Sequence, residues 1–137
     1  MSYIYLASPY SHSDPEVRKR REEQISQIGY VLMNHGYNLF CPITQSHRLA
    51  EVGNTLLKHE DCMRVDLAFL EKADALFVAQ LSGWNESKGV QEEIEFAKKN
   101  NIPIHYVTVN RSGLLINKLF IEDSQGQPLH GRTLGNA

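Results

Sequence analysis

The chain lacks the cysteine pattern and the long apolar runs that mark secreted or membrane proteins. It has two cysteines among 137 residues, Cys41 and Cys62, and no CxxC or disulfide-framework spacing. Together with the absence of a signal peptide, this pattern predicts a reducing, cytoplasmic location. No apolar segment approaches the length that spans a bilayer, so we expect no membrane partner.

An excess of charge and a metal-binding motif are also missing. Lys and Arg number 14 against 16 Asp and Glu, for a formal net charge of -2. This balance gives no electrostatic reason to expect a nucleic-acid polymer as partner. The six histidines show no HxxxH or HxH pattern, and "HEDC" at residues 59–62 fits a helix start better than a zinc site. We therefore expect no metal and no other cofactor.

The elements that are present alternate between strands and helices. The length and a 42% hydrophobic composition fit one globular domain over residues 1–137. Four β-rich runs, "YIYLA", "YNLFC", "DALFVAQL" and "IPIHYVTV", are separated by helical segments. This order predicts a small doubly wound parallel sheet, Rossmann- or flavodoxin-like, with helices on both faces.

Caps and stops set the expected boundaries of the other segments. Asp14 as N-cap and Pro15 at the first helical position begin a helix that ends at Gly36. Residues 43–58 lack periodicity and are predicted mainly as a long loop. "GLLINKLF" at residues 113–120 is compatible with a short helix, and the tail after Glu122 is expected to be loosely held.

One glutamate of the third helix is predicted to face inward. In "SKGVQEEIEFA", Val90, Ile94 and Ala97 form one apolar stripe, since successive helical residues are about 100° apart. Glu92 and Glu95 lie opposite, whereas Glu93 lies three residues after Val90 and points at the sheet.

The second helix repeats this pattern with Asp66. Met63, Leu67 and Leu70 form its stripe, and Asp66 lies three residues after Met63. Either acid alone fits a partly wet stripe edge, but two on neighbouring helices suggest a use, because an unpaired buried carboxylate costs several kcal/mol. Paired acids can serve as nucleophile and proton handler at a carbon that bears a leaving group.

Three segments, "YIYLASPY", "DLAFLEKADALFVAQ" and "SKGVQEEIEFA", resemble the nucleoside 2-deoxyribosyltransferase superfamily, which includes 2'-deoxynucleoside 5'-phosphate N-hydrolases. The resemblance covers about residues 3 to 113. It implies that Glu93 attacks the anomeric carbon and forms a glycosyl-enzyme ester, while Asp66 assists at the leaving base or positions the sugar. Water then completes an N-glycosidase reaction, or a second base completes a transfer.

The resemblance also implies substrate-binding residues. The loop with Ser8, Pro9 and Tyr10 would cradle the sugar or its 5'-phosphate, a role compatible with an ordinary turn. Ser87 and the backbone around Gly89 would bind phosphate in a similar way.

The first loop departs from the pattern of the phosphate-preferring members. Those members tend to carry an arginine in this loop, where the chain has Tyr10 and His12. Arg18 or Arg21 can substitute, but helical spacing does not show that they reach. The choice between a nucleotide and a nucleoside therefore stays open.

Family members are homo-oligomers, so the resemblance implies a homodimer or homotetramer whose site a neighbouring subunit completes. "NRSG" at residues 110–113 resembles the completing segment, which makes Ser112 or Asn110 the candidate, although a plain turn fits equally. Tyr5 and Trp84 can stack on a base or pack in the core. The loop segment and Tyr10 also leave room for a non-catalytic nucleotide-binding module.

Overall fold

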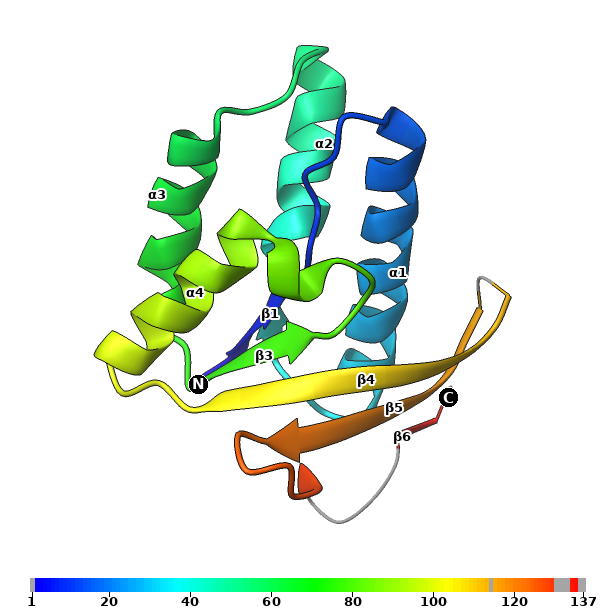
Figure 1. The fold of residues 1–137 in the computed structure, drawn as a ribbon, viewed down its shortest axis with the longest axis vertical. Coiled ribbons are helices and arrows are strands. Elements are labelled where there is room, and N and C mark those ends of the chain that lie inside the picture. The colour runs from blue at the N-terminus through cyan, green and yellow to red at the C-terminus, as the bar shows by residue number, and fades with distance from the viewer. Residues whose placement is uncertain (1, 114, 130–133, 136–137) are drawn as a thin grey trace.

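The computed structural model describes residues 2–113, 115–129 and 134–135 (Figure 1). Within them, six strands form one mixed sheet in the order β2-β1-β3-β4-β5-β6. Their bounds are Ile4–Ala7 (β1), Leu39–Phe40 (β2), Ala75–Ala79 (β3), Ile104–Ser112 (β4), Leu115–Asp123 (β5) and Leu134–Gly135 (β6). The first four strands pair in parallel and the last two are antiparallel, which confirms a single α/β domain with a mostly parallel sheet.

Four α-helices surround the sheet in the described residues. Their bounds are Pro15–Asn34 (α1), Pro42–Gly53 (α2), His59–Leu70 (α3) and Lys88–Lys99 (α4), with a 3-10 turn at Trp84–Glu86 (η1). The start of α1 is as predicted: the Asp14 side chain accepts a hydrogen bond from the Glu16 amide at 2.9 Å. None of the described helices combines the length and apolar character that crossing a membrane requires.

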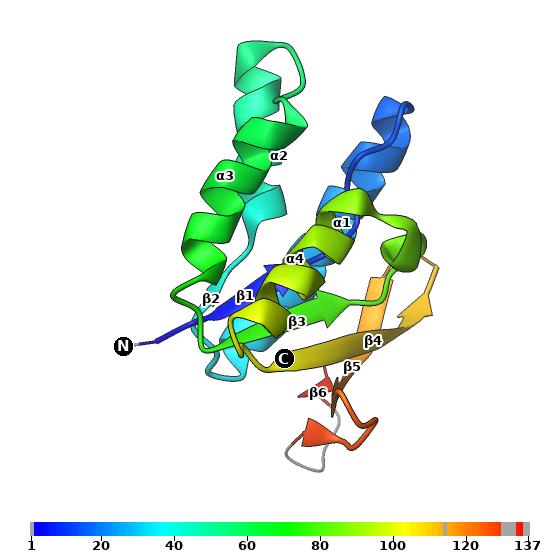
Figure 2. The same cartoon turned by 60° about the vertical axis from the view of Figure 1, so that its left-hand side comes forward.

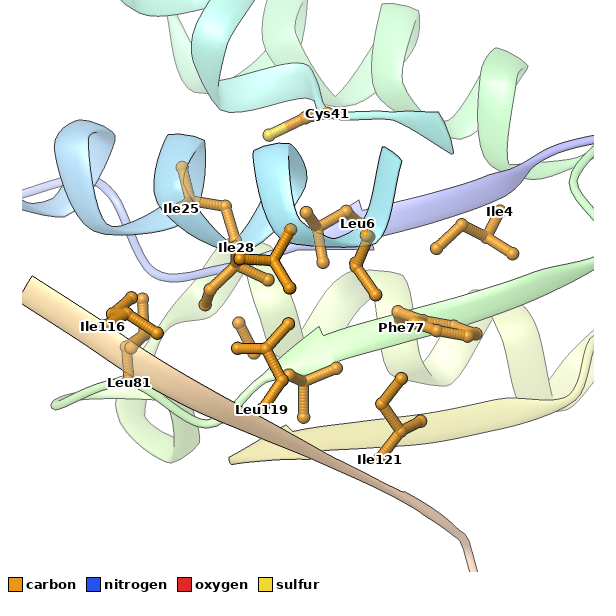
Figure 3. Close-up of a cluster of buried hydrophobic side chains, with 14 of the residues drawn as sticks. Ile4, Leu6, Ile25, Ile28, Cys41, Phe77, Leu81, Ile116, Leu119 and Ile121 are labelled. Carbon is orange, nitrogen blue, oxygen red and sulfur yellow. The ribbon is translucent and has the colours of Figure 1, made fainter. Parts of the chain in front are cut away.

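Alternation along the strands divides the core into two clusters. Ile4 and Leu6 of β1 belong to a cluster that packs against α1 and is shown in Figure 3. Tyr5 and Ala7 belong to a second cluster, together with buried residues of α3 and α4. The sheet therefore buries apolar side chains on both faces.

The predicted loop at residues 43–58 is wrong, because α2 covers Pro42–Gly53. Pro42 occupies a favourable first position, and Asn54 ends the helix in the left-handed conformation with φ 58°. Pro42 is the only buried residue of this helix. Ile43 of α2 packs partly against the first core cluster, but Ser46 and Ala50 further along the helix line a cavity, so the apolar stripe that faces the core is short.

The possible short helix at residues 113–120 is also wrong, because this segment forms most of β5. The pairing of β4 with β5 shifts register between Asn110 and Arg111. This irregularity leaves Ile116 and Leu119 buried three residues apart, which imitates helical spacing. Beyond β5, the Asp123 carboxylate accepts hydrogen bonds from two backbone amides of the following turn. His130 lies outside the described residues.

Candidate active site

A cavity of about 580 Å³ lies beyond the carboxyl ends of β1 and β3. It is enclosed by the loop that follows β1, by α1, α2 and α3, and by the start of α4. The upper parts of α1, α2 and α3 extend past the strand ends (Figure 2). Ligands of open α/β sheets bind at this edge.

Glu93 lies on the inner face of α4, as its spacing predicts. Its side chain is only 4% exposed, whereas Glu95 on the same helix is exposed. The fully buried Tyr5 hydroxyl, which comes from β1, donates a hydrogen bond to Glu93 Oε2. Tyr5 thus packs in the core, and its hydroxyl holds the Glu93 carboxyl group in place.

Asp66 on α3 is half-buried and lines the same cavity as Glu93. The structure therefore places both predicted acids in the lining of one cavity. Burial raises the pKa of Asp66 to about 6, and the nearby His59 opposes this effect.

Burial also raises the pKa of Glu93, to about 8. The hydrogen bond from Tyr5 opposes this rise, and the charge of Asp66 adds to it. Between about pH 6 and 8 the two acids therefore hold one proton between them. The higher pKa places this proton mainly on Glu93 and leaves Asp66 ionised, so Glu93 can act as a nucleophile only after its proton has moved to Asp66.

The start of α4 faces the cavity. Ser87 caps the helix by accepting a hydrogen bond from the Val90 amide at 3.3 Å, and Ser87, Lys88 and Gly89 line the cavity. The amides and dipole of a helix N-terminus favour an anion there. A side chain at Gly89 would meet no atom within 4 Å, so space does not require this glycine.

The loop after β1 contributes two of its three predicted residues to the cavity. Ser8 and Tyr10 line it, whereas Pro9 is buried and does not. The Tyr10 hydroxyl lies 2.8 Å from Nδ1 of His47 on α2. Among the described residues, the buried Ser8 Oγ has no hydrogen-bond partner.

Arg18 and Arg21 reach the cavity from α1, which helical spacing alone did not establish. Arg18 donates to the backbone carbonyl of His12, and Arg21 donates to that of Ser11 at 2.9 Å. Their separation of three residues, which places both on one helix face, was the available signal. The path of the preceding loop decides that this face meets the cavity.

Other predicted residues lie elsewhere. Asn110 and Ser112 are exposed at the end of β4 and do not line the cavity. The Trp84 ring meets the Tyr106 ring edge-on, with 5.8 Å between the ring centroids, and it packs against the second core cluster. Across the described residues, no group of three or more His, Cys, Asp or Glu side chains is placed to hold a metal ion.

The chain belongs to the family described as a domain of unknown function, DUF1937, whose profile matches residues 2–108. A comparison with curated proteins gives no match. The matched range contains every residue that lines the cavity, whereas Asn110 and Ser112 lie beyond it.

Proposed function

We propose that the chain is an N-glycosidase that cleaves the N-glycosidic bond of a (2'-deoxy)nucleoside 5'-monophosphate or nucleoside through a glycosyl ester on Glu93. One observation carries the proposal: the buried Glu93, held by Tyr5, shares a cavity with Asp66 from the neighbouring helix. The resemblance to the nucleoside 2-deoxyribosyltransferase superfamily supports the same roles. Two carboxyl groups that flank a glycosidic bond are the usual machinery for its cleavage.

The reaction proceeds in two balanced steps. After the proton that Glu93 holds has passed to Asp66, a Glu93 carboxylate oxygen bonds to the anomeric carbon as the bond from that carbon to the base nitrogen breaks. The departing nitrogen keeps the bonding electrons and takes the proton that the acid pair holds, through Asp66. Water then attacks the anomeric carbon, the ester bond to Glu93 breaks, and the water proton returns to the acid pair.

The surroundings of Glu93 suit an oxocarbenium-like transition state. A carboxylate that is removed from water interacts more strongly with a positive charge developing on the sugar. Tyr5 fixes the orientation of the Glu93 carboxyl group, so little rearrangement is needed when that charge appears.

The position of the cavity supports a nucleotide-binding sheet of the doubly wound type. The strand order β2-β1-β3-β4 is that of flavodoxin-like sheets, and the cavity lies where the order reverses, between β1 and β3. We extend the proposal to a homodimer or homotetramer in which the exposed Asn110 or Ser112 completes a neighbour's site. Both cysteines are free, which agrees with a reducing cytoplasm.

The test is a chromatographic screen for base released from a panel of nucleosides and nucleotides. We expect release by the wild type and its loss in Glu93→Gln, while Glu95→Gln, an exposed control on the same helix, keeps it. Unchanged turnover in Glu93→Gln would refute the proposal.

A second free base in the same mixture separates hydrolysis from transfer. Appearance of a new nucleoside indicates a transferase with the same nucleophile, and free sugar indicates the hydrolase. Thermal stabilisation by a ligand without any base release across the panel indicates a non-catalytic binding module.

A further inference from the structure

Within the described residues, a single side-chain hydrogen bond joins α2 to another element. The Tyr10 hydroxyl, from the loop after β1, lies 2.8 Å from Nδ1 of His47. The other side-chain hydrogen bonds of α2, which Thr44, Ser46 and Arg48 make, stay within the helix or reach its N-cap. The contact between Tyr10 and His47 is therefore the polar link between α2 and the loop after β1.

Little else fixes the position of α2. Pro42 is its only buried residue, and Ile43 is partly buried against the first core cluster. The helix nevertheless forms one wall of the cavity, through Ser46 and Ala50 further along. A contact that holds this part of α2 against the loop therefore also sets the shape of the cavity on this side.

The loop after β1 is likewise held by side chains. In the part of the chain that the structure describes, residues 9–13 take part in no backbone–backbone hydrogen bond. Arg18 and Arg21 of α1 donate to carbonyls of this loop, and His47 of α2 contacts the Tyr10 side chain. Tyr10 lines the cavity and His47 does not, so His47 can influence a ligand only through Tyr10.

Glu51 favours one of the two neutral forms of the His47 ring. Its Oε2 lies 3.8 Å from Nε2 of His47, one helical turn away, while Arg48 pairs with the other carboxylate oxygen at 3.3 Å. A carboxylate on this side favours a proton on Nε2, which leaves the Nδ1 lone pair free to accept a hydrogen bond. The Tyr10 hydroxyl is then the donor, and its one proton points at His47.

The charges around this contact come from two helices. Arg18 and Glu22 of α1 and Glu51 of α2 act on the Tyr10 hydroxyl. Partial burial raises the pKa of Tyr10, and the charge of Arg18 and its hydrogen bond oppose this rise. Tyr10 therefore keeps the proton that it donates. Protonation of the whole imidazole would instead turn Nδ1 of His47 into a donor and remove the acceptor.

From this arrangement we infer that His47 is a positioning residue of the candidate active site. It fixes the Tyr10 side chain, and with it the loop after β1, against α2, so that the cavity has its shape before a ligand enters. Groups that are held in place in this way need not be ordered when the ligand binds. The inference rests on the proposed function only for the class of ligand, because that function makes no use of His47.

Nuclear magnetic resonance of the 15N-labelled protein tests the direction of the hydrogen bond. The ring nitrogens of His47 are identified by the loss of their signals in His47→Asn. We expect Nδ1 to be the nitrogen without a proton in the neutral ring, and its signal to shift in Tyr10→Phe, which lacks the donor. A proton on Nδ1, or no response to Tyr10→Phe, would overturn the inference.

The second test measures dissociation constants in a Glu93→Gln background, in which we expect a substrate to stay intact. The probe is the nucleoside or nucleotide that stabilises this protein most in a thermal screen. His47→Leu removes the acceptor and should weaken binding about 3- to 10-fold. His47→Asn places an amide oxygen near the position of Nδ1 and should bind within about 2-fold of His47 itself. Gln45→Leu, at an exposed position of α2, should leave binding unchanged.

A double variant separates positioning from a general effect on the fold. If His47 acts through Tyr10, His47→Leu combined with Tyr10→Phe should bind no more weakly than Tyr10→Phe alone. Losses that multiply, unchanged binding in His47→Leu, or no recovery in His47→Asn would each contradict the positioning role. Urea unfolding without ligand shows whether each variant is folded.

Base release separates this inference from the proposed function. If His47→Leu weakens binding and His47→Asn restores it, but no base is released from any compound, the positioning role stands and the glycosidase proposal fails. If base is released and kcat/KM is the same in the wild type and His47→Leu, the glycosidase stands and the positioning role fails.

Discussion

Replacing Glu93 with glutamine should change how the stability of the protein depends on pH. The pKa of Glu93 is about 8 in the folded protein and 4.5 in its ordinary state. Between these values the folded protein holds a proton that the unfolded chain has released. Stability is therefore full below about pH 4.5 and is lost as the pH rises through 8.

The size of this loss follows from the shift. The folded and unfolded pKa values of Glu93 differ by about 3.5. At about 1.4 kcal/mol for each pH unit, the free energy of unfolding falls by on the order of 5 kcal/mol between low and high pH. Solvent screening does not reduce this figure much, because the Glu93 side chain is only 4% exposed. Glutamine has nearly the same shape, stays neutral at every pH and still accepts a hydrogen bond from Tyr5.

Urea unfolding followed by circular dichroism at pH 5, 7 and 9 measures the difference. We expect Glu93→Gln to match the wild type within about 1 kcal/mol at pH 5 and to exceed it by several kcal/mol at pH 9. Glu95→Gln, whose side chain is exposed beside Lys99, should follow the wild type. Parallel pH profiles for the wild type and Glu93→Gln would show that Glu93 is not buried with a raised pKa.

Four further predictions follow from the same site. Base release should peak between about pH 6 and 8 in kcat/KM, because below this range both acids are protonated and above it neither holds a proton. Tyr5→Phe removes a donor to Glu93, so the alkaline limb should move to higher pH and the rate at pH 7 should fall about 10-fold or more. Ser8→Ala should leave the protein as stable or up to about 1 kcal/mol more stable in urea, because it removes a buried hydroxyl that has no hydrogen-bond partner among the described residues. Gly83→Ala should destabilise the protein by about 1–3 kcal/mol in urea, because it strains the backbone and displaces Arg21.

The acid pair was accessible from sequence because helical periodicity is a strong signal where a helix packs on a sheet. Val90, Ile94 and Ala97 are buried as their spacing predicts, so the odd residue in the stripe, Glu93, could be located. The partner of that carboxylate was harder to assign. Tyr5 lies 88 residues away in the chain, and only the packing of α4 on β1 shows that its hydroxyl reaches Glu93.

Sequence analysis missed α2 and most of β5. In both elements the apolar residues do not follow the regular spacing that packing on a core produces. The inner face of α2 borders the cavity, so small and polar residues such as Ser46 and Ala50 replace an apolar stripe. In β5 an irregular register replaced strict alternation. The position of Arg21 depends on a glycine in a distant loop, Gly83, and no local pattern records such a contact.

Strand β1 explains why acids and arginines meet at one cavity without neutralising one another. Residues of a strand point alternately to its two faces, and Tyr5 belongs to the cluster that faces α4. Ile4 and Leu6 point to the other face, toward α1, and Ser8, directly after the strand, lines the cavity together with the two arginines of α1. The Tyr5 hydroxyl already donates to Glu93, so the groups that a ligand can contact are Glu93 on the side of α4 and Ser8 on the side of α1, and a ligand that contacts both extends over the end of β1.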